Sequence, residues 1–138
     1  MKIEFCDKIF PEINELLEAE FQKYETENQV SCDFKHFCII AKENNEILGA
    51  LTGMTFFSEA YIDELLVLPK HRRQGIGRKL LSYLEEHFKK HNFTNISLDT
   101  REFQAPEFYK KCGYSLEFVR KNPKFPKFTK YFFVKWLI

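Results

Sequence analysis

Long apolar runs, net charge and paired cysteines are all missing from this sequence. No apolar stretch reaches the roughly 18 residues that a membrane-spanning helix needs. Lysine and arginine number 21 against 20 acidic residues, so the net charge of +1 gives no general attraction to nucleic acid or to a membrane. The four cysteines include no Cys-x-x-Cys pair, and the first residues lack a signal-peptide pattern. We therefore expect a cytoplasmic protein with reduced thiols.

A metal site is not indicated either. His87 and His91 stand four residues apart on a predicted helix, a spacing that can bind a metal, but no third ligand is evident. We interpret both as part of a solvated helix face and expect no metal. The 138 residues include 16 Phe and 6 Tyr, which is enough for one packed core. We expect a single domain over residues 1–138.

Glycine is scarce as well, with five residues in the chain, and two of them stand two positions apart in one turn. An apolar, strand-like run at residues 62–68 precedes this turn. After the turn, apolar residues recur at helical spacing among charged ones: Leu80, Leu81, Leu84 and Phe88. The sequence therefore predicts a strand, a turn that contains Gly75 and Gly77, and a helix.

A turn of this kind can hold an anion. The first amides of a helix have no partner inside it, and the helix dipole adds partial positive charge there. Glycine has no Cβ to keep an anion away from the backbone, so a phosphate or pyrophosphate can approach. Basic residues flank the glycines: Arg72, Arg73, Arg78 and Lys79. The Arg-Lys-Leu that follows Gly77 excludes a nucleoside triphosphate loop, and the dinucleotide fingerprint requires three glycines.

Two motifs carry a resemblance to a known family. Arg-x-x-Gly-x-Gly between a strand and a helix resembles the coenzyme A pyrophosphate loop of the GNAT superfamily of N-acetyltransferases. Residues 105–114 are similar to a later helix of that family, which reads Ala-x-x-Phe/Leu-Tyr-x-x-x-Gly-Phe/Tyr. The motifs stand in the family's order, with room for one helix and one strand between them. The resemblance is dense over residues 47–115, and it implies acetyl-CoA as co-substrate.

Periodicity and turn residues predict the order of elements. We expect strands at residues 2–5, 37–41 and 47–57, a strand ending at residue 68, and strands at 96–98, 116–119 and 131–137. We expect helices at residues 9–25, 75–90 and 104–111. This mixture of hairpins and crossover helices predicts an α/β (α+β) fold. The GNAT-like arrangement would be a mixed, mostly antiparallel sheet of six to seven strands with helices on both faces.

The resemblance also implies which residues bind the cofactor. Its pyrophosphate would lie against the loop residues Arg72, Arg73, Gln74, Gly75, Ile76, Gly77 and Arg78. Backbone groups of the preceding strand, at Leu66, Val67 and Leu68, would pair with the pantetheine amides and polarise the acetyl carbonyl. Tyr109 would lie beside the sulfur and protonate the leaving thiolate. Taken by itself, Tyr109 could equally be a buried aromatic residue whose hydroxyl bonds to a backbone carbonyl.

The general base is less defined. Asp63 and Glu64 stand on the strand before the loop, and strand alternation predicts that only one of them faces the cleft. The resemblance favours Glu64, although an ordinary salt bridge is an equal alternative, and Asp99 is a third candidate. Seven residues before the tyrosine, where family members often carry Asn, this chain has Glu102. A carboxylate cannot supply the amide donor of that contact.

These features predict an N-acetyltransferase that moves an acetyl group to a primary amine by direct attack in a ternary complex. The acceptor would contact residues 9–30 and the last hairpin, whose loop interleaves lysines with Phe125 and Phe128: Lys121, Lys124, Lys127 and Lys130. This loop favours an acidic substrate or a nucleic-acid-like partner, or it is simply solvated. We expect a small-molecule amine rather than a protein amine, no nucleic-acid or membrane partner, and a monomer or homodimer. The alternative is a non-catalytic acyl-CoA sensor or scaffold.

Overall fold

The computed structural model describes all 138 residues, which form two compact units, residues 1–32 and 33–138. In the first unit, helix α1 (Pro11–Glu27) confirms the helix predicted at 9–25. Pro11 stands in its first turn, where a missing backbone N–H costs nothing. The apolar residues of α1 recur at helical spacing and all are exposed: Ile13, Leu16, Leu17, Phe21 and Tyr24.

The strand predicted at residues 2–5 is wrong. These residues have no regular structure, because they form no ladder with a neighbouring strand. Alternation of polar and apolar residues marks a segment that can pair, but the pairing itself supplies the hydrogen bonds that make a strand. The prediction of one domain over the whole chain stays a prediction.

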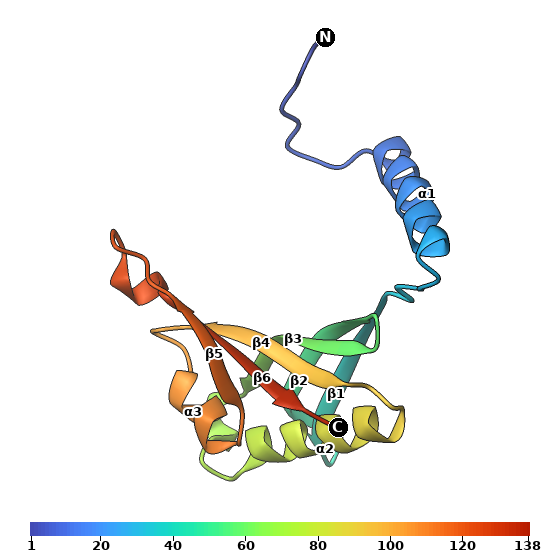
Figure 1. The fold of residues 1–138 in the computed structure, drawn as a ribbon. Coiled ribbons are helices and arrows are strands. Elements are labelled where there is room, and N and C mark those ends of the chain that lie inside the picture. Colours follow the sequence, from blue (N-terminus) through green and yellow to red (C-terminus); the bar gives the residue numbers. More distant parts are fainter. The chain divides into compact units, whose positions relative to one another are not determined.

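The second unit is built on a sheet of six strands in the order β1-β2-β3-β4-β6-β5 (Figure 1). The strands are β1 (Lys35–Glu43), β2 (Glu46–Phe56), β3 (Glu59–Val67), β4 (Asn95–Arg101), β5 (Ser115–Arg120) and β6 (Lys130–Trp136). Only β3 and β4 pair in parallel, whereas every other neighbouring pair is antiparallel. The predicted mixed, mostly antiparallel sheet is confirmed.

Turn residues set the ends of these elements. Asn44 and Asn45 adopt positive φ in the β1–β2 hairpin, as asparagine tolerates. The β2–β3 turn uses Phe57 and Ser58, so the strand predicted at residues 47–57 ends one residue earlier, at Phe56. The helices of this unit are α2 (Ile76–Lys90) and α3 (Pro106–Lys111), and Gly113 follows α3 with φ of +87°. Two short 3-10 turns complete the unit, Pro69–His71 and Pro126–Phe128.

Helices α2 and α3 cover the same face of the sheet (Figure 1). The apolar stripe predicted for α2 forms the centre of the core, with Leu81 and Leu84 fully buried against Leu51, Ile96 and Phe133 from the strands. The expectation of helices on the opposite face as well stays a prediction. None of the helices combines the length and the apolar character needed to cross a bilayer. We call the sheet face away from α2 and α3 the open face.

Candidate active site

The two parallel strands separate soon after they meet. β3 pairs with β4 only from Glu59↔Asn95 to Tyr61↔Ser97, and beyond this point β3 keeps only its partner β2. The Leu68 N–H donates to the Leu48 carbonyl of the β2 side at 2.9 Å. Backbone groups alternate in direction along a strand, so Val67 directs its N–H and C=O toward the side that β4 has left. The separation thus leaves the backbone polar groups on this edge of β3 without a strand partner.

The loop after β3 presents a second set of unpartnered amides. Gly75 adopts φ of +78°, which glycine reaches without strain, and α2 begins directly after it at Ile76. No side chain caps this helix end, and the N–H groups of Ile76, Gly77 and Arg78 have no acceptor within the protein. A Cβ at Gly77 would lie 3.1 Å from the ring of Phe108, so a glycine lets α3 pack closely against the loop. This helix start therefore has the unpartnered amides that the predicted anion site requires, and anion binding itself stays a prediction.

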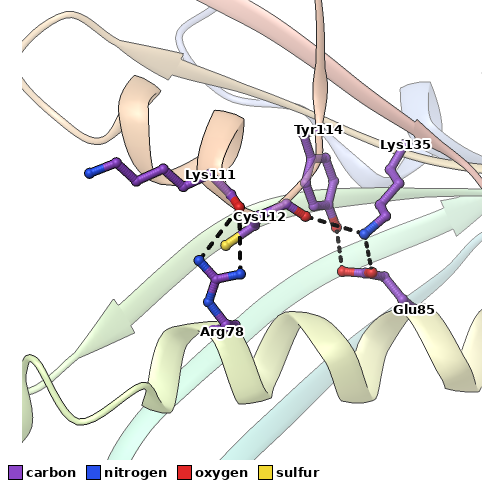
Figure 2. Close-up of polar contacts among 6 residues, drawn as sticks. All are labelled: Arg78, Glu85, Lys111, Cys112, Tyr114 and Lys135. Carbon is purple, nitrogen blue, oxygen red and sulfur yellow. Dashed lines mark hydrogen bonds and ion pairs between the residues drawn. The ribbon is translucent and has the colours of Figure 1, made fainter.

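The arginines of the loop differ in what they contact. Arg72 donates from Nε to the Val67 carbonyl at 2.9 Å, which leaves its other N–H groups unused. Arg73 adopts positive φ and makes no polar contact within the protein. Arg78 points both terminal nitrogens at the Lys111 carbonyl, at 3.5 Å each, and so lies against the end of α3 (Figure 2). Arg72 and Arg73 therefore remain available for an anion.

Tyr109 of α3 is well buried, with 7% of its surface exposed. Its hydroxyl forms no hydrogen bond within the protein, and it is not among the polar atoms sealed from solvent. Burial, with a smaller contribution from Cys112, raises the pKa of Tyr109 to about 12. The phenol therefore stays protonated at neutral pH and can donate a proton. The alternative, a hydroxyl bonded to a backbone carbonyl, is not what the structure has.

These groups meet around a cavity of about 430 Å³. Eight of the residues proposed from the sequence line it: Val67, Arg72, Arg73, Gly75, Ile76, Gly77, Arg78 and Tyr109. Leu66, Leu68 and Gln74 do not, and Gln74 instead lines a separate hollow between β1 and α2. The cavity also includes residues that we did not propose: Leu65, His71, Ala105 and Phe108. Ala105 and Phe108 belong to the second motif, so the motif could have indicated that they line the cavity. Nothing in the sequence indicated His71.

A polar network holds the C-terminal end of α3, and Figure 2 shows how its side chains converge. Lys135 of β6 lies 2.5 Å from the Glu85 carboxylate of α2 and donates to the Cys112 carbonyl at 3.2 Å. The Tyr114 hydroxyl donates to the other Glu85 oxygen at 3.4 Å. With Arg78 at Lys111, two cations thus contact the last carbonyls of α3, where the helix dipole is negative. The network fixes the short helix that carries Tyr109.

The two strand carboxylates are not arranged as alternation predicts. Thr52 pairs with Glu64 but the next β2 residue, Gly53, pairs with Ile62, so Asp63 is an extra residue in a β-bulge. Both carboxylates are exposed, between the buried Ile62 and the half-buried Leu65. The Thr52 hydroxyl donates to Glu64 at 3.4 Å. Our expectation that the two side chains lie on opposite faces is wrong, because the bulge breaks the alternation, and neither carboxylate is buried.

Asp99 is the least exposed of the three candidate bases, with 23% of its side chain accessible to solvent. It stands two residues beyond Ser97, the last β4 residue that pairs with β3. The Tyr61 hydroxyl donates to it at 2.6 Å, and the Lys130 ammonium lies 4.0 Å away. Burial and the neighbouring Asp99 raise the pKa of Tyr61. Asp99 therefore sits where the strands part, on the open face, with two donors around it.

Glu102 is engaged inside the protein. The Tyr131 hydroxyl donates to its carboxylate, and this bond raises the pKa of Tyr131. Its backbone N–H donates to the Thr129 carbonyl at 2.9 Å. The carboxylate that stands at the family's Asn position thus anchors the last hairpin to the end of β4.

Comparisons with known proteins agree on one family. Residues 6–114 match the model of the acetyltransferase (GNAT) family. An acetyltransferase of Agrobacterium fabrum is 32% identical over 76 residues, which cover 55% of this chain and only 56% of that protein. The crystal structure of an acetyltransferase from Bacillus cereus matches with a TM-score of 0.78 and 29% identity, over 96% of this chain and 97% of that one. An aminoglycoside 6'-N-acetyltransferase complexed with coenzyme A shares the fold, with a TM-score of 0.67 and 18% identity over 100% and 98% of the two chains.

Proposed function

Because the chain belongs to the acetyltransferase (GNAT) family, we propose that it is an acetyl-CoA-dependent N-acetyltransferase. The acceptor is a primary amine of a small molecule, and the amine attacks directly in a ternary complex. The observation that carries this proposal is the cavity of about 430 Å³, where three unused donor groups meet. They are the free amides at the start of α2, the unpaired edge of β3 and the unbonded hydroxyl of Tyr109.

These groups fit coenzyme A by their chemistry. The amides of Ile76, Gly77 and Arg78, with the free guanidinium groups of Arg72 and Arg73, suit a pyrophosphate. The backbone of Val67 suits the amides of a pantetheine arm, since its N–H has no strand partner and its carbonyl, which accepts from Arg72, keeps a second lone pair. Acetyl-CoA, when bound, supplies the acetyl group as a thioester.

The residues of the chain then have separate tasks. The backbone N–H of the β3 edge stabilises negative charge on an acyl oxygen, because it is a donor already held in place by the strand. Tyr109, kept protonated by its raised pKa, donates its phenolic proton to the departing sulfur. Such a donor contributes about 10²–10⁴-fold in rate. The network around Lys135 and Glu85 keeps α3 in place, so the hydroxyl does not have to be ordered when the reaction occurs.

A carboxylate on the open face takes the proton of the amine, directly or through water. Glu64 is the first choice because it is exposed and has only a weak contact to Thr52. Asp63 is beside it in the bulge. Asp99 lies closer to the separation of the strands but already accepts from Tyr61. An exposed carboxylate can exchange its proton with solvent after each turnover, which favours Glu64 or Asp63.

Two measurements test the proposal together. Calorimetry with acetyl-CoA tests binding, and a thiol-release assay against polyamines, amino acids, aminoglycosides and peptides tests transfer and acceptor class. We expect binding and thiol release with small amines. Binding without thiol release on any acceptor would instead indicate an acyl-CoA sensor or scaffold, and release with peptides alone would indicate a protein amine.

A pair of glycine variants ties binding to the loop. Gly75→Val places a side chain on a left-handed backbone with no other atom within 4 Å, so the fold should survive while the side chain blocks the amides. Gly113→Ala also places a side chain on a left-handed backbone, at φ of +87° and away from the cavity, and serves as the control. We expect acetyl-CoA affinity to be lost in the first variant and kept in the second. Equal affinity in both variants would remove the loop from the site.

A further inference from the structure

The β5–β6 hairpin lies outside the residues that match the family model, yet its loop is well ordered by local bonds. The Asn122 side-chain oxygen accepts from the N–H groups of Lys124 and Phe125 at 3.1 and 2.8 Å. The Thr129 hydroxyl, which is buried, accepts from the Asn122 N–H at 3.1 Å. The loop that connects β5 and β6 therefore has a fixed shape, with Asn122 at its centre.

Three cations stand in one row across the adjacent strands β4, β6 and β5. Arg101 pairs with Lys130, and Lys130 pairs with Arg120 on its other side. Directly opposed side chains in antiparallel strands have Cβ atoms about 5 Å apart, and like charges placed this way repel each other. The row is thus unfavourable in the absence of a counter-charge.

Little inside the protein supplies that counter-charge. Arg101 donates to the Phe128 carbonyl at 3.0 Å and lies over its ring, and Arg120 lies over the ring of Phe132. Neither guanidinium forms an ion pair with a carboxylate. Lys130 alone has an acidic neighbour, Asp99, at 4.0 Å. Stacking against the rings fixes the direction of the guanidinium groups without neutralising them.

These cations share a cavity of about 290 Å³ with Lys121, and no acidic residue lines it. The cavity lies close to Asp99, one of the three candidate bases. Arg101 and Asp99 are two residues apart on β4, so they share the open face at a spacing of about 7 Å. A small molecule can therefore reach the basic cavity with one end and the surroundings of Asp99, where β3 and β4 separate, with the other.

We propose that this cavity binds an anionic group, carboxylate or phosphate, of the acceptor whose amine is acetylated. The proposal rests on the proposed acetyltransferase function and adds the class of acceptor, a small amine with an anionic end. Arginine suits this task because its planar group meets carboxylate and phosphate oxygens in pairs. The bound anion also offsets the repulsion within the row.

The first test needs no activity. Thermal unfolding of the full chain is measured with sodium phosphate and with sodium succinate, each against sodium chloride at equal ionic strength. Both anions should raise the Tm of the wild type, because a ligand that binds only the folded state stabilises it. The double variant Arg120→Gln/Lys121→Gln should lose this shift. The matched control Lys124→Gln/Lys127→Gln removes two charges from the same loop outside the cavity, and it should keep the shift.

The second test uses the thiol-release assay with three acceptors of similar length: butylamine, 4-aminobutyrate and 3-aminopropyl phosphate. The wild type should acetylate an anionic acceptor with a KM at least tenfold below that of butylamine. The Arg120→Gln/Lys121→Gln variant should lose this preference and keep its KM for acetyl-CoA. A lower KM for the phosphate or for the carboxylate identifies the anion.

Two results would overturn the inference. One is an equal anion-induced Tm shift in both double variants, which would reduce the effect to a diffuse positive field. The other is a wild type that acetylates butylamine as well as the anionic amines. A protein that neither binds acetyl-CoA nor releases thiol would contradict the proposed function instead, while the Tm measurement would still decide whether the cavity binds anions.

Discussion

Replacing Lys135 with methionine should loosen the end of α3 and thereby slow the reaction. Methionine keeps most of the apolar stem of lysine but removes the ammonium. Its loss leaves the Glu85 carboxylate, 19% exposed, with only the 3.4 Å bond from Tyr114. The Cys112 carbonyl at the end of α3 loses its donor as well.

The size of the effect follows from the partial burial of this pair. Exposed ion pairs contribute about 0–1 kcal/mol, whereas removing one partner of a buried pair costs about 3–5 kcal/mol. The Lys135 side chain is 31% exposed, which places the pair between these limits. We expect the free energy of unfolding to fall by about 2 kcal/mol, or a Tm lower by about 7 °C for a chain of this length.

Urea unfolding followed by circular dichroism measures the stability, and thiol release measures kcat. The control is Lys110→Met, which breaks the exposed pair with Glu107 on the same helix and should cost less than about 0.5 kcal/mol. The double variant Lys135→Met/Glu85→Gln should recover part of the loss, since no charge is then left without a partner. A loss below about 0.5 kcal/mol for Lys135→Met, or strictly additive losses, would refute the role of this network.

Three further predictions concern the site itself. Gly77→Ala brings a Cβ to 3.1 Å from the Phe108 ring, so calorimetry should show that the affinity for acetyl-CoA falls at least about tenfold. The free energy of unfolding should change by less than about 1 kcal/mol, because alanine favours the helix. Tyr109→Phe should lower kcat about 10²-fold or more with little change in the KM for acetyl-CoA. The pKa of Tyr109 is raised to about 12 in the folded protein, against about 10 in the unfolded chain, so the fold loses stability as the pH rises from about 10 to 12. Unfolding titrations at alkaline pH should show a smaller loss in the Tyr109→Phe variant. Glu64→Gln should flatten the acid limb of kcat/KM while Asp63→Asn changes it little; a full pH profile in both variants would assign the proton to Asp99 or to solvent.

The family and the unit of strand, glycine turn and helix were predictable because their signals are local. The family prediction is confirmed by the match over residues 6–114. Glycine spacing, helical periodicity and the stop at Gly113 each depend on residues within one or two turns of the chain. The helices at the loop and at the second motif therefore begin and end close to where the sequence placed them.

What escaped prediction depends on partners far away in the chain. The bulge at Asp63 arises from the register of β3 against Thr52 and Gly53, and no local pattern at residue 63 announces it. Residues 2–5 alternate as a strand would, but no ladder forms there. The basic loop was visible as four lysines, yet the cavity uses Lys121 and Lys130 with two arginines from β4 and β5. Only strand pairing brings Arg101, Lys130 and Arg120 into one row.

The bulge in β3 changes which residue numbers face the core. Before it, the residues that face the core have even numbers, Ala60 and Ile62, and after it they have odd numbers, Leu65 and Val67. Deletion of Asp63 would remove the extra residue, so that Ile62 and Glu64 become neighbours opposite Gly53 and Thr52, while Leu65 and Val67 keep their partners Leu51 and Gly49 and still face the core. The bulge thus accommodates one extra exposed residue, which places a second carboxylate beside Glu64 without changing the side chains that face the core on either side of it. Deletion of Asp63 should therefore leave acetyl-CoA affinity largely unchanged, because the backbone edge at Val67 keeps its register against β2.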